Sequence, residues 1–138
     1  MSRNTFHVSL YVDDIPKAVD AYRQILGTEP AKVRHDYAKF EVEDPPTILS
    51  LSLGGTPGTL SHLGIRYPGT GEVATEMMRA KREELPLLEQ PNATCCYAKA
   101  DKFWLRDANG VAWEMYTLLE DVEAETAADP ELRRMLGQ

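Results

Sequence analysis

The sequence predicts an α+β fold built from two halves that share one order of elements: a strand, a helix and then further strands. Several short tracts alternate between apolar and polar residues, which is typical of strands whose two faces differ. Two longer tracts instead have apolar residues at helical spacing. The order of tracts starts again after Gly54-Gly55-Thr56-Pro57-Gly58, so we take this break as the boundary between the halves.

The first half begins with a strand followed by a helix. Residues 6–12 alternate between apolar and polar side chains, and His7 falls on the more polar face. The segment Asp13-Asp14-Ile15-Pro16 supplies a capping aspartate and an early proline, and apolar residues then recur at helical spacing until a glycine. Two strands are expected next, at 37–43 and 47–53, with a proline-rich connection between them.

The second half repeats this order. Its first strand alternates from His62 to Tyr67, and a helical tract follows at about 71–85. Further strands are expected at 94–98, 102–106 and 111–116, the last of them after the turn signal Asn109-Gly110.

We therefore expect one domain over residues 1–138, with a first module at about 5–58 and a second at about 60–118. Neither half alone is large enough to bury a full sheet face, whereas two such units can enclose a cleft. The remainder, 119–138, is read as an accessory tail in which Asp129-Pro130-Glu131 begins a helix.

Composition narrows the classes of partner. A net charge of −7 over 138 residues disfavours nonspecific binding to nucleic acid and to anionic membranes, which are themselves negatively charged. The first residues lack the apolar core of a signal peptide, and no apolar run approaches the ~20 residues of a membrane span. These features predict a cytoplasmic protein that acts on a small molecule or another protein.

Three potential metal ligands fall in three different expected strands. His7 and His62 lie in the first strand of each half, and Glu114 lies in the last strand, on the same face as Tyr116. Two imidazoles and one carboxylate leave coordination positions open, which suits iron(II), although zinc, manganese and nickel use similar sets. The alternative is that each histidine packs in the core or on the surface and that Glu114 is simply solvated.

Cys95 and Cys96 are the only cysteines in the chain, and they are neighbours. Adjacent thiolates can chelate a soft centre such as trivalent arsenic or cadmium, while the alternative is a pair of small buried apolar residues. In a regular strand the two side chains would point to opposite faces, so joint binding requires a bulge, loop or rearrangement. Pro91 and Asn92 just before them make such an irregularity reasonable.

The chain resembles the vicinal oxygen chelate superfamily, which includes glyoxalases, bleomycin-resistance proteins and dioxygenases. His7, His62 and Glu114 stand at its ligand positions, and the resemblance covers roughly residues 5 to 118. The branch that contains carbon-arsenic lyases and cadmium-induced proteins is the most similar, because of Asp36-Tyr37-Ala38-Lys39-Phe40, the tract from Thr94-Cys95-Cys96 to Trp104, and Asp107 through Trp113-Glu114.

This resemblance implies two βαβββ modules that form a curved mixed sheet around a metal-binding cleft. It implies an iron(II)- and oxygen-dependent lyase that demethylates or dearylates trivalent organoarsenicals to arsenite. His7, His62 and Glu114 would bind the metal, most naturally Fe(II) or else another divalent ion, and Cys95 and Cys96 would bind arsenic. Two alternatives remain: a noncatalytic cadmium- or arsenic-binding protein, and a metal-dependent glyoxalase or dioxygenase with another substrate. Whether the chain acts alone or as a homodimer stays open.

Other residues are weaker candidates. His35 lies in a charged connection, residues 32–36, and is expected to be an exposed loop histidine. Trp104 and Trp113 can wall an apolar pocket or pack in the core, and Tyr11 and Tyr116 can line the cavity or pack. Lys99 and Lys102 are expected to be solvated more often than functional. The strand at 47–53 contains no carboxylate or histidine, which argues against a glyoxalase that draws a further acidic ligand from there.

Overall fold

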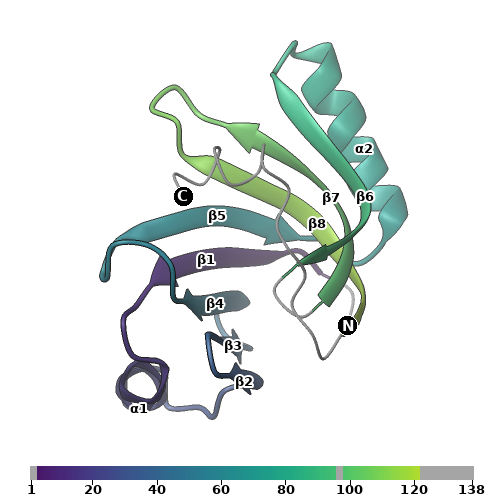
Figure 1. The fold of residues 1–138 in the computed structure, drawn as a ribbon. Helices are drawn as coiled ribbons and strands as arrows, with labels where there is room; N and C mark the ends of the chain where they lie inside the picture. The colour runs from purple at the N-terminus through teal and green to yellow at the C-terminus, as the bar shows by residue number, and fades with distance from the viewer. Residues whose placement is uncertain (1–2, 96–97, 122–138) are drawn as a thin grey trace.

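The computed structural model describes residues 3–95 and 98–121. Within these residues the chain forms one eight-stranded sheet and two helices (Figure 1). In chain order the elements are β1 (Thr5–Tyr11), α1 (Ile15–Leu26), β2 (Lys32–Arg34), β3 (Tyr37–Val42), β4 (Thr47–Ser52), β5 (Leu60–Arg66), α2 (Thr70–Arg82), β6 (Leu87–Cys95), β7 (Ala98–Arg106) and β8 (Ala112–Asp121).

The sheet is mixed and joins the two halves through their first strands. Its strand order is β2-β3-β4-β1-β5-β8-β7-β6. β1 runs parallel to β4 and β5 runs parallel to β8, whereas β1 and β5 pair antiparallel at the centre. Each half therefore places its first strand beside its last. The same parallel pairing of first and last strand flanks the central β1–β5 pair on both sides. The predicted α+β class, with two βαβββ modules in a curved mixed sheet, is confirmed.

The first helix has the ends that its sequence predicts. The Asp14 side chain accepts a hydrogen bond from the backbone N–H of Lys17 at 3.0 Å, which satisfies one of the free donors of the first turn. Pro16 occupies the first turn, where its missing N–H is not needed. Gly27 ends the helix with φ of +68°, a left-handed conformation that glycine adopts without a steric penalty.

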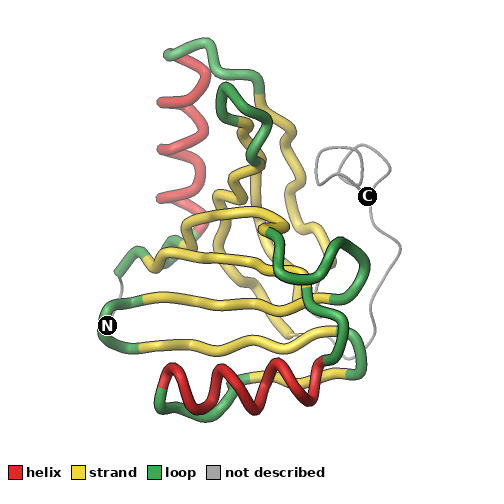
Figure 2. Tube along the Cα trace, turned by 90° about the vertical axis from the view of Figure 1, so that its left-hand side faces the viewer, coloured by secondary structure: helices red, strands yellow, loops and turns green. Residues whose placement is uncertain are grey.

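The two faces of the sheet have different roles. The apolar residues of β1, β3 and β4 pack under α1, where Phe40, Leu49 and Leu51 meet Ile15 and Val19. A second cluster, which includes Val73, Phe103 and Met115, lies under α2. Figure 2 shows both helices outside the curved sheet, so the polar residues that alternate with these apolar ones face the inner side.

Some strand boundaries differ from the prediction. The tract 32–36 was expected to be a connection, but Lys32–Arg34 forms the edge strand β2. A single strand was expected at 94–98, whereas β6 ends at Cys95 and β7 begins at Ala98. The error arose because residues 87–93 lack clear alternation: β6 and β7 shift register between Gln90 and Ala93.

The remaining expectations concern the end of the chain and membranes. β8 continues to Asp121, and the expected tail helix at Asp129-Pro130-Glu131 lies outside the described residues. Among the helices that the structure describes, none has the length and apolar character needed to cross a bilayer.

Candidate metal centre

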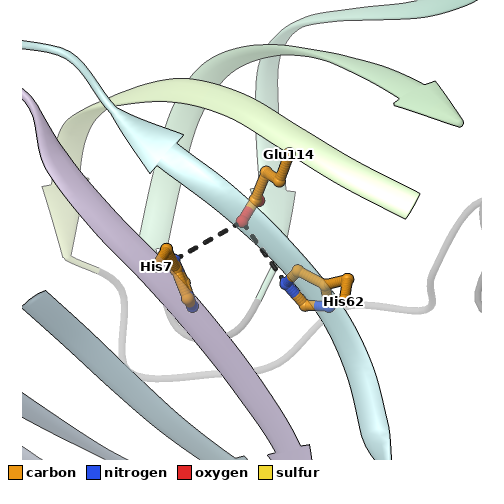
Figure 3. Close-up of side chains that lie close together, drawn as sticks. All are labelled: His7, His62 and Glu114. Atoms are coloured by element: carbon orange, nitrogen blue, oxygen red, sulfur yellow. Dashed lines mark ion pairs between the residues drawn. The ribbon is translucent and has the colours of Figure 1, made fainter. Parts of the chain in front are cut away.

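His7, His62 and Glu114 come together on the inner face of three adjacent strands (Figure 3). His7 is on β1, His62 on β5 and Glu114 on β8. Gly64 pairs with His7 on one side and with Glu114 on the other, and His62 lies one inward position further along β5. The β1–β5 pair and the β5–β8 pair thus place His7, from the first half, next to His62 and Glu114, from the second half.

The spacing of their polar atoms suits one divalent ion. Glu114 Oε1 lies 3.5 Å from His62 Nε2 and 3.8 Å from His7 Nδ1. One candidate ligand atom from each of the three residues lies within 4.8 Å of the other two. Two atoms that are each about 2.1 Å from a shared metal are about 3.0–3.5 Å apart at ordinary coordination angles, so small side-chain movements would complete the site. All three side chains are buried, so bulk water has little access to them.

Hydroxyl groups hold both histidine rings. The nitrogen of each ring that points away from Glu114 has a serine neighbour: Ser50 Oγ lies 3.0 Å from His7 Nε2, and Ser61 Oγ lies 3.0 Å from His62 Nδ1. Tyr116 Oη lies 2.6 Å from His7 Nδ1. When the serine Oγ accepts a hydrogen bond from the outer N–H, the inner nitrogen carries the lone pair, which is the tautomer that a metal ligand needs.

Lys102 neutralises Glu114 from the side opposite the histidines. Its Nζ lies 2.6 Å from Glu114 Oε2, and both side chains are buried. Burial raises the pKa of Glu114, but Lys102 and the two imidazoles lower it by more, so the pKa lies well below the usual range of a carboxylic acid. Glu114 is therefore a carboxylate at neutral pH.

His7 is kept neutral by the same surroundings. Burial lowers the pKa of His7 to about 3, and the neighbouring His62, Lys102 and Lys39 lower it too, against the opposing effect of Glu114. Metal ligation requires the neutral imidazole, so this protonation state is the useful one.

A small cavity lies over these side chains and measures about 30 Å³, enough for an ion with a water molecule. Lys39, Ser50 and Tyr116 line it together with Ala98 and Ala100 at the start of β7. Its lining therefore combines the three candidate ligands with the strand that directly follows the cysteine tract.

The cysteine tract is only partly described. β6 ends at Cys95, whose backbone pairs with Ala98, while Cys96 lies outside the described residues. The irregularity expected near Pro91 and Asn92 is present: Asn92 has φ of +52°, and its N–H donates to Asp101 Oδ1 at 2.6 Å. Arsenic binding by the pair remains a prediction.

Of the weaker candidates, Trp104 and Tyr116 lie at the centre, whereas Trp113 and His35 lie away from it. Trp104 meets the His62 ring edge-on at a centroid distance of 5.1 Å, whereas Trp113 lies near Phe6 on the other face of the sheet. The His35 side chain is 85% exposed, as expected for a loop residue. Tyr116 lines the cavity.

Sequence reasoning missed three residues at this centre. It did not select Ser50 and Ser61, and it treated Lys102 as a solvated lysine, although Lys102 is only 5% exposed. Alternation does assign Ser50 and Lys102 to the inner faces of their strands, and this was the available signal.

Comparisons with known proteins identify the family of the chain. The model of the Glyoxalase/Bleomycin resistance protein/Dioxygenase superfamily matches residues 5–115. The cadmium-induced protein CadI of Mycobacterium tuberculosis (strain H37Rv) is 38% identical over 117 residues, which are 84% of this chain and 77% of CadI. A trivalent organoarsenical cleaving enzyme of Bacillus sp. (strain MD1) is 36% identical over 127 residues, which are 90% of this chain and 79% of that enzyme.

Solved structures share the fold at low sequence identity. An extradiol ring-cleaving dioxygenase from B. fuscum superposes with a TM-score of 0.64 at 16% identity, over 88% of this chain and 34% of that one. The Mn(II)-bound glyoxalase from Novosphingobium aromaticivorans gives 0.62 at 13% identity, over 98% and 51%. The family model matches residues 5–115, which are most of this chain, and the two relatives are 38% and 36% identical to it. The chain therefore belongs to the glyoxalase/bleomycin resistance protein/dioxygenase superfamily.

Proposed function

We propose that this protein is a cytoplasmic, iron(II)- and oxygen-dependent carbon-arsenic bond lyase that demethylates or dearylates trivalent organoarsenicals to arsenite. The observation that carries the proposal is the convergence of His7, His62 and Glu114 in one buried cluster. It occurs in a chain that is 36% identical to an enzyme named for cleaving trivalent organoarsenicals.

The donor set supports a resident iron(II). Two neutral imidazoles and one carboxylate are a set that non-haem iron(II) oxygenases use, with positions left open for other ligands. When bound there, iron(II) would supply the redox chemistry that dioxygen needs in order to react. The chain itself contributes the buried carboxylate of Glu114, the neutral imidazole of His7 and the buried His62, with a small cavity over them.

Cys95 and Cys96 are proposed to bind the arsenic. A trivalent arsenical with one organic group has two exchangeable positions, which two thiolates can fill while the carbon-arsenic bond stays intact. The backbone of Cys95 pairs with Ala98, and Ala98 lines the cavity beside the metal-binding candidates. The thiols would hold the substrate next to the reactive centre, which replaces a chance encounter by a positioned one.

The reaction balances for the simplest substrate. Methylarsonous acid and one molecule of dioxygen contain the atoms of arsenous acid and formaldehyde. Arsenic stays trivalent, the methyl carbon is oxidised and dioxygen is reduced. We therefore expect one dioxygen to be consumed for each arsenite released.

The test is direct. Protein loaded with iron(II) under anaerobic conditions is mixed with methylarsonous acid and exposed to air, and arsenite is measured by chromatography with arsenic-specific detection. The expected result is oxygen-dependent release of arsenite over many turnovers. Iron that is demonstrably bound but releases no arsenite would refute the proposed reaction.

Variants separate the two proposed roles. Cys95→Ser and Cys96→Ser should weaken arsenical binding and leave iron binding intact, whereas His7→Ala should do the reverse. Glu29→Gln alters an exposed carboxylate that pairs with Arg23 at 2.9 Å and is not part of the cluster, and it serves as the control. Equal loss of both kinds of binding in each variant would contradict the division of labour.

A second candidate is a noncatalytic thiol protein that sequesters cadmium or arsenite. The similarity to the cadmium-induced proteins favours it, because those relatives are 38% identical. It predicts stoichiometric uptake of cadmium through Cys95 and Cys96 with no turnover of any organoarsenical. Isothermal titration with cadmium, run beside the arsenite assay, distinguishes it from the lyase.

A metal-dependent glyoxalase or dioxygenase with another substrate is the third candidate. The shared fold with an extradiol dioxygenase and a glyoxalase favours it. On the inner face of β4, however, the residue that meets His7 is Ser50 and not a further acidic ligand. Assays of catechol ring cleavage and of methylglyoxal-glutathione isomerisation test this candidate.

A further inference from the structure

The carboxylate of Glu114 is shared between two different partners. Oε1 faces the two histidines, at 3.5 Å from His62 Nε2 and 3.8 Å from His7 Nδ1. Oε2 faces the ammonium of Lys102 at 2.6 Å. The two oxygens thus face two different places for a cation: Oε1 faces the candidate metal position between the histidines, and Oε2 faces the Lys102 ammonium.

Lys102 is held in this position and is not a surface lysine that happens to be near. Its side chain is 4% exposed, and fully buried lysines are rare because the charge is costly to remove from water. Its Nζ lies 5.8 Å from the centre of the Trp104 ring and 6.0 Å from that of Tyr116. Aromatic faces at this distance attract a cation and limit where the ammonium can move.

The number of carboxylate oxygens that bind a metal decides how many positions stay free. An octahedral ion with three single-atom protein ligands has about three open positions, which an oxygen-using centre requires. If both oxygens of Glu114 bound the ion, one of these positions would be lost. A buried ammonium on Oε2 prevents this, because the metal would have to displace a short charge-assisted hydrogen bond.

We infer that Lys102 is a positioning residue that restricts Glu114 to binding a metal through Oε1 alone and so keeps a coordination position free. The inference rests on the metal centre of the proposed function and does not depend on the substrate. Lys102 acts through Glu114 and need not touch the metal or the arsenical.

The experiment counts water ligands on Mn(II), an ion that accepts the same donor set. Binding is titrated by electron paramagnetic resonance of free Mn(II), and coordinated waters are counted from the broadening caused by ¹⁷O-labelled water. The proteins are the full-length wild type, Lys102→Met, Lys102→Leu and Lys102→Arg. Lys99→Met is the matched control, because it removes an exposed lysine of β7 that pairs with Glu120 of β8 at 3.2 Å. Circular dichroism checks that each variant is folded.

The expected result is that Lys102→Met and Lys102→Leu bind one Mn(II) with one fewer water than the wild type. Lys102→Arg, which keeps a cation on Oε2, should retain the wild-type count, as should Lys99→Met. Lys102→Leu is included so that the comparison survives if Lys102→Met does not fold.

Two outcomes overturn the inference. An unchanged water count in either folded, Mn(II)-loaded variant means that Lys102 does not control the carboxylate. Loss of Mn(II) binding in the folded variants means that Lys102 supports the site itself and does not select its geometry. Failure of the wild type to bind any divalent metal would instead refute the metal centre of the proposed function, so the two failures are distinguishable.

Discussion

The two histidines illustrate how single hydroxyl groups can prepare a metal site. His7 Nε2 and His62 Nδ1 each have a serine Oγ at 3.0 Å, and in each ring the other nitrogen faces Glu114. If the serine Oγ accepts a hydrogen bond from the ring N–H, the inner nitrogen carries the lone pair. Outer partners of this kind orient the ring and raise its basicity, and their loss typically costs about 10–100-fold in metal affinity.

The first prediction follows from the two partners of His7. Ser50→Ala removes the partner of the outer nitrogen, so divalent metal should bind about 10-fold more weakly. Tyr116→Phe removes a hydroxyl that lies 2.6 Å from the inner nitrogen and competes with a metal there, so metal affinity should be unchanged or higher. Titration of both variants with Mn(II) measures this. The opposite pattern would mean that His7 binds through Nε2.

The second prediction concerns pH in the metal-free protein. The pKa of His7 is lowered to about 3, chiefly by burial, whereas an unfolded histidine titrates near 6.5. The unfolded chain therefore binds the extra proton first, and stability that is fully present above about pH 6.5 is lost as the pH falls towards 3. We expect the free energy of unfolding to fall by about 2 kcal/mol from this group between about pH 8 and about pH 5.

Urea unfolding of the metal-free wild type and of His7→Gln at both pH values tests this. The variant lacks the titrating ring, so its stability should depend less on pH by about the same 2 kcal/mol. Parallel pH dependence in the two proteins would show that His7 is not held neutral.

At the scale of the elements, the centre depends on close contact between β5 and β8. Gly64 lies on the inner face of β5 between His7 and Glu114, its partners on the neighbouring strands. A Cβ at this position would clash with the backbone oxygen of Glu114 and lie 3.2 Å from its Cβ. Backbone cannot move away as a flexible side chain can, so only glycine allows the two strands to pair here at this distance.

The third prediction is that Gly64→Ala damages both the fold and the centre. Forcing β5 and β8 apart should cost roughly 1–3 kcal/mol of stability and displace Glu114 from the histidines. Gly71→Ala is the matched control: an added Cβ would meet no atom within 4 Å beyond its own stretch of helix, and the residue falls in α2, where alanine is the better helix former. Denaturant unfolding and Mn(II) titration of both variants check this. Wild-type metal affinity in Gly64→Ala would contradict the argument.

The elements differed in how readily the sequence revealed them. β1 was predicted from its strict alternation, α1 from its capping residues Asp14 and Gly27, and β3 and β4 from the proline-rich connection between them and the glycine-rich break that follows. β2 was missed because three residues, two of them charged, give too short a pattern to recognise. β6 was missed because its register shift interrupts the alternation near Asn92. Pattern reasoning fails where strands are short or irregular, since it depends on an uninterrupted period.

At the scale of the whole molecule, the inner face could be predicted only in part. Repetition of His7 and His62 in corresponding strands, with Glu114 in the last strand, indicated that these three side chains would converge, and they do. The partners of these residues depend on which strands become neighbours. Ser50 reaches His7 because β4 pairs parallel with β1, and Lys102 reaches Glu114 because β7 pairs with β8. Alternation alone does not contain that information.

The same arrangement makes the metal a link between the two halves. His7 belongs to β1 of the first half, whereas His62 and Glu114 belong to β5 and β8 of the second. An ion bound by all three binds only the folded state, because unfolding separates residues that are far apart in the chain. At a free concentration of about 100 times its dissociation constant, such an ion stabilises the fold by about 2.7 kcal/mol.

The fourth prediction is that Mn(II) raises the melting temperature of the wild type by roughly 10 °C under these conditions and that a chelator reverses the change. Glu114→Gln lacks the charged ligand and should show a much smaller rise, even though Gln is nearly the same size as Glu. Glu72→Gln is the control, because this carboxylate lies in the first turn of α2, outside the cluster. Differential scanning calorimetry measures all three proteins. An equal rise in Glu114→Gln and the wild type would mean that the ion binds elsewhere and does not join the two halves at this centre.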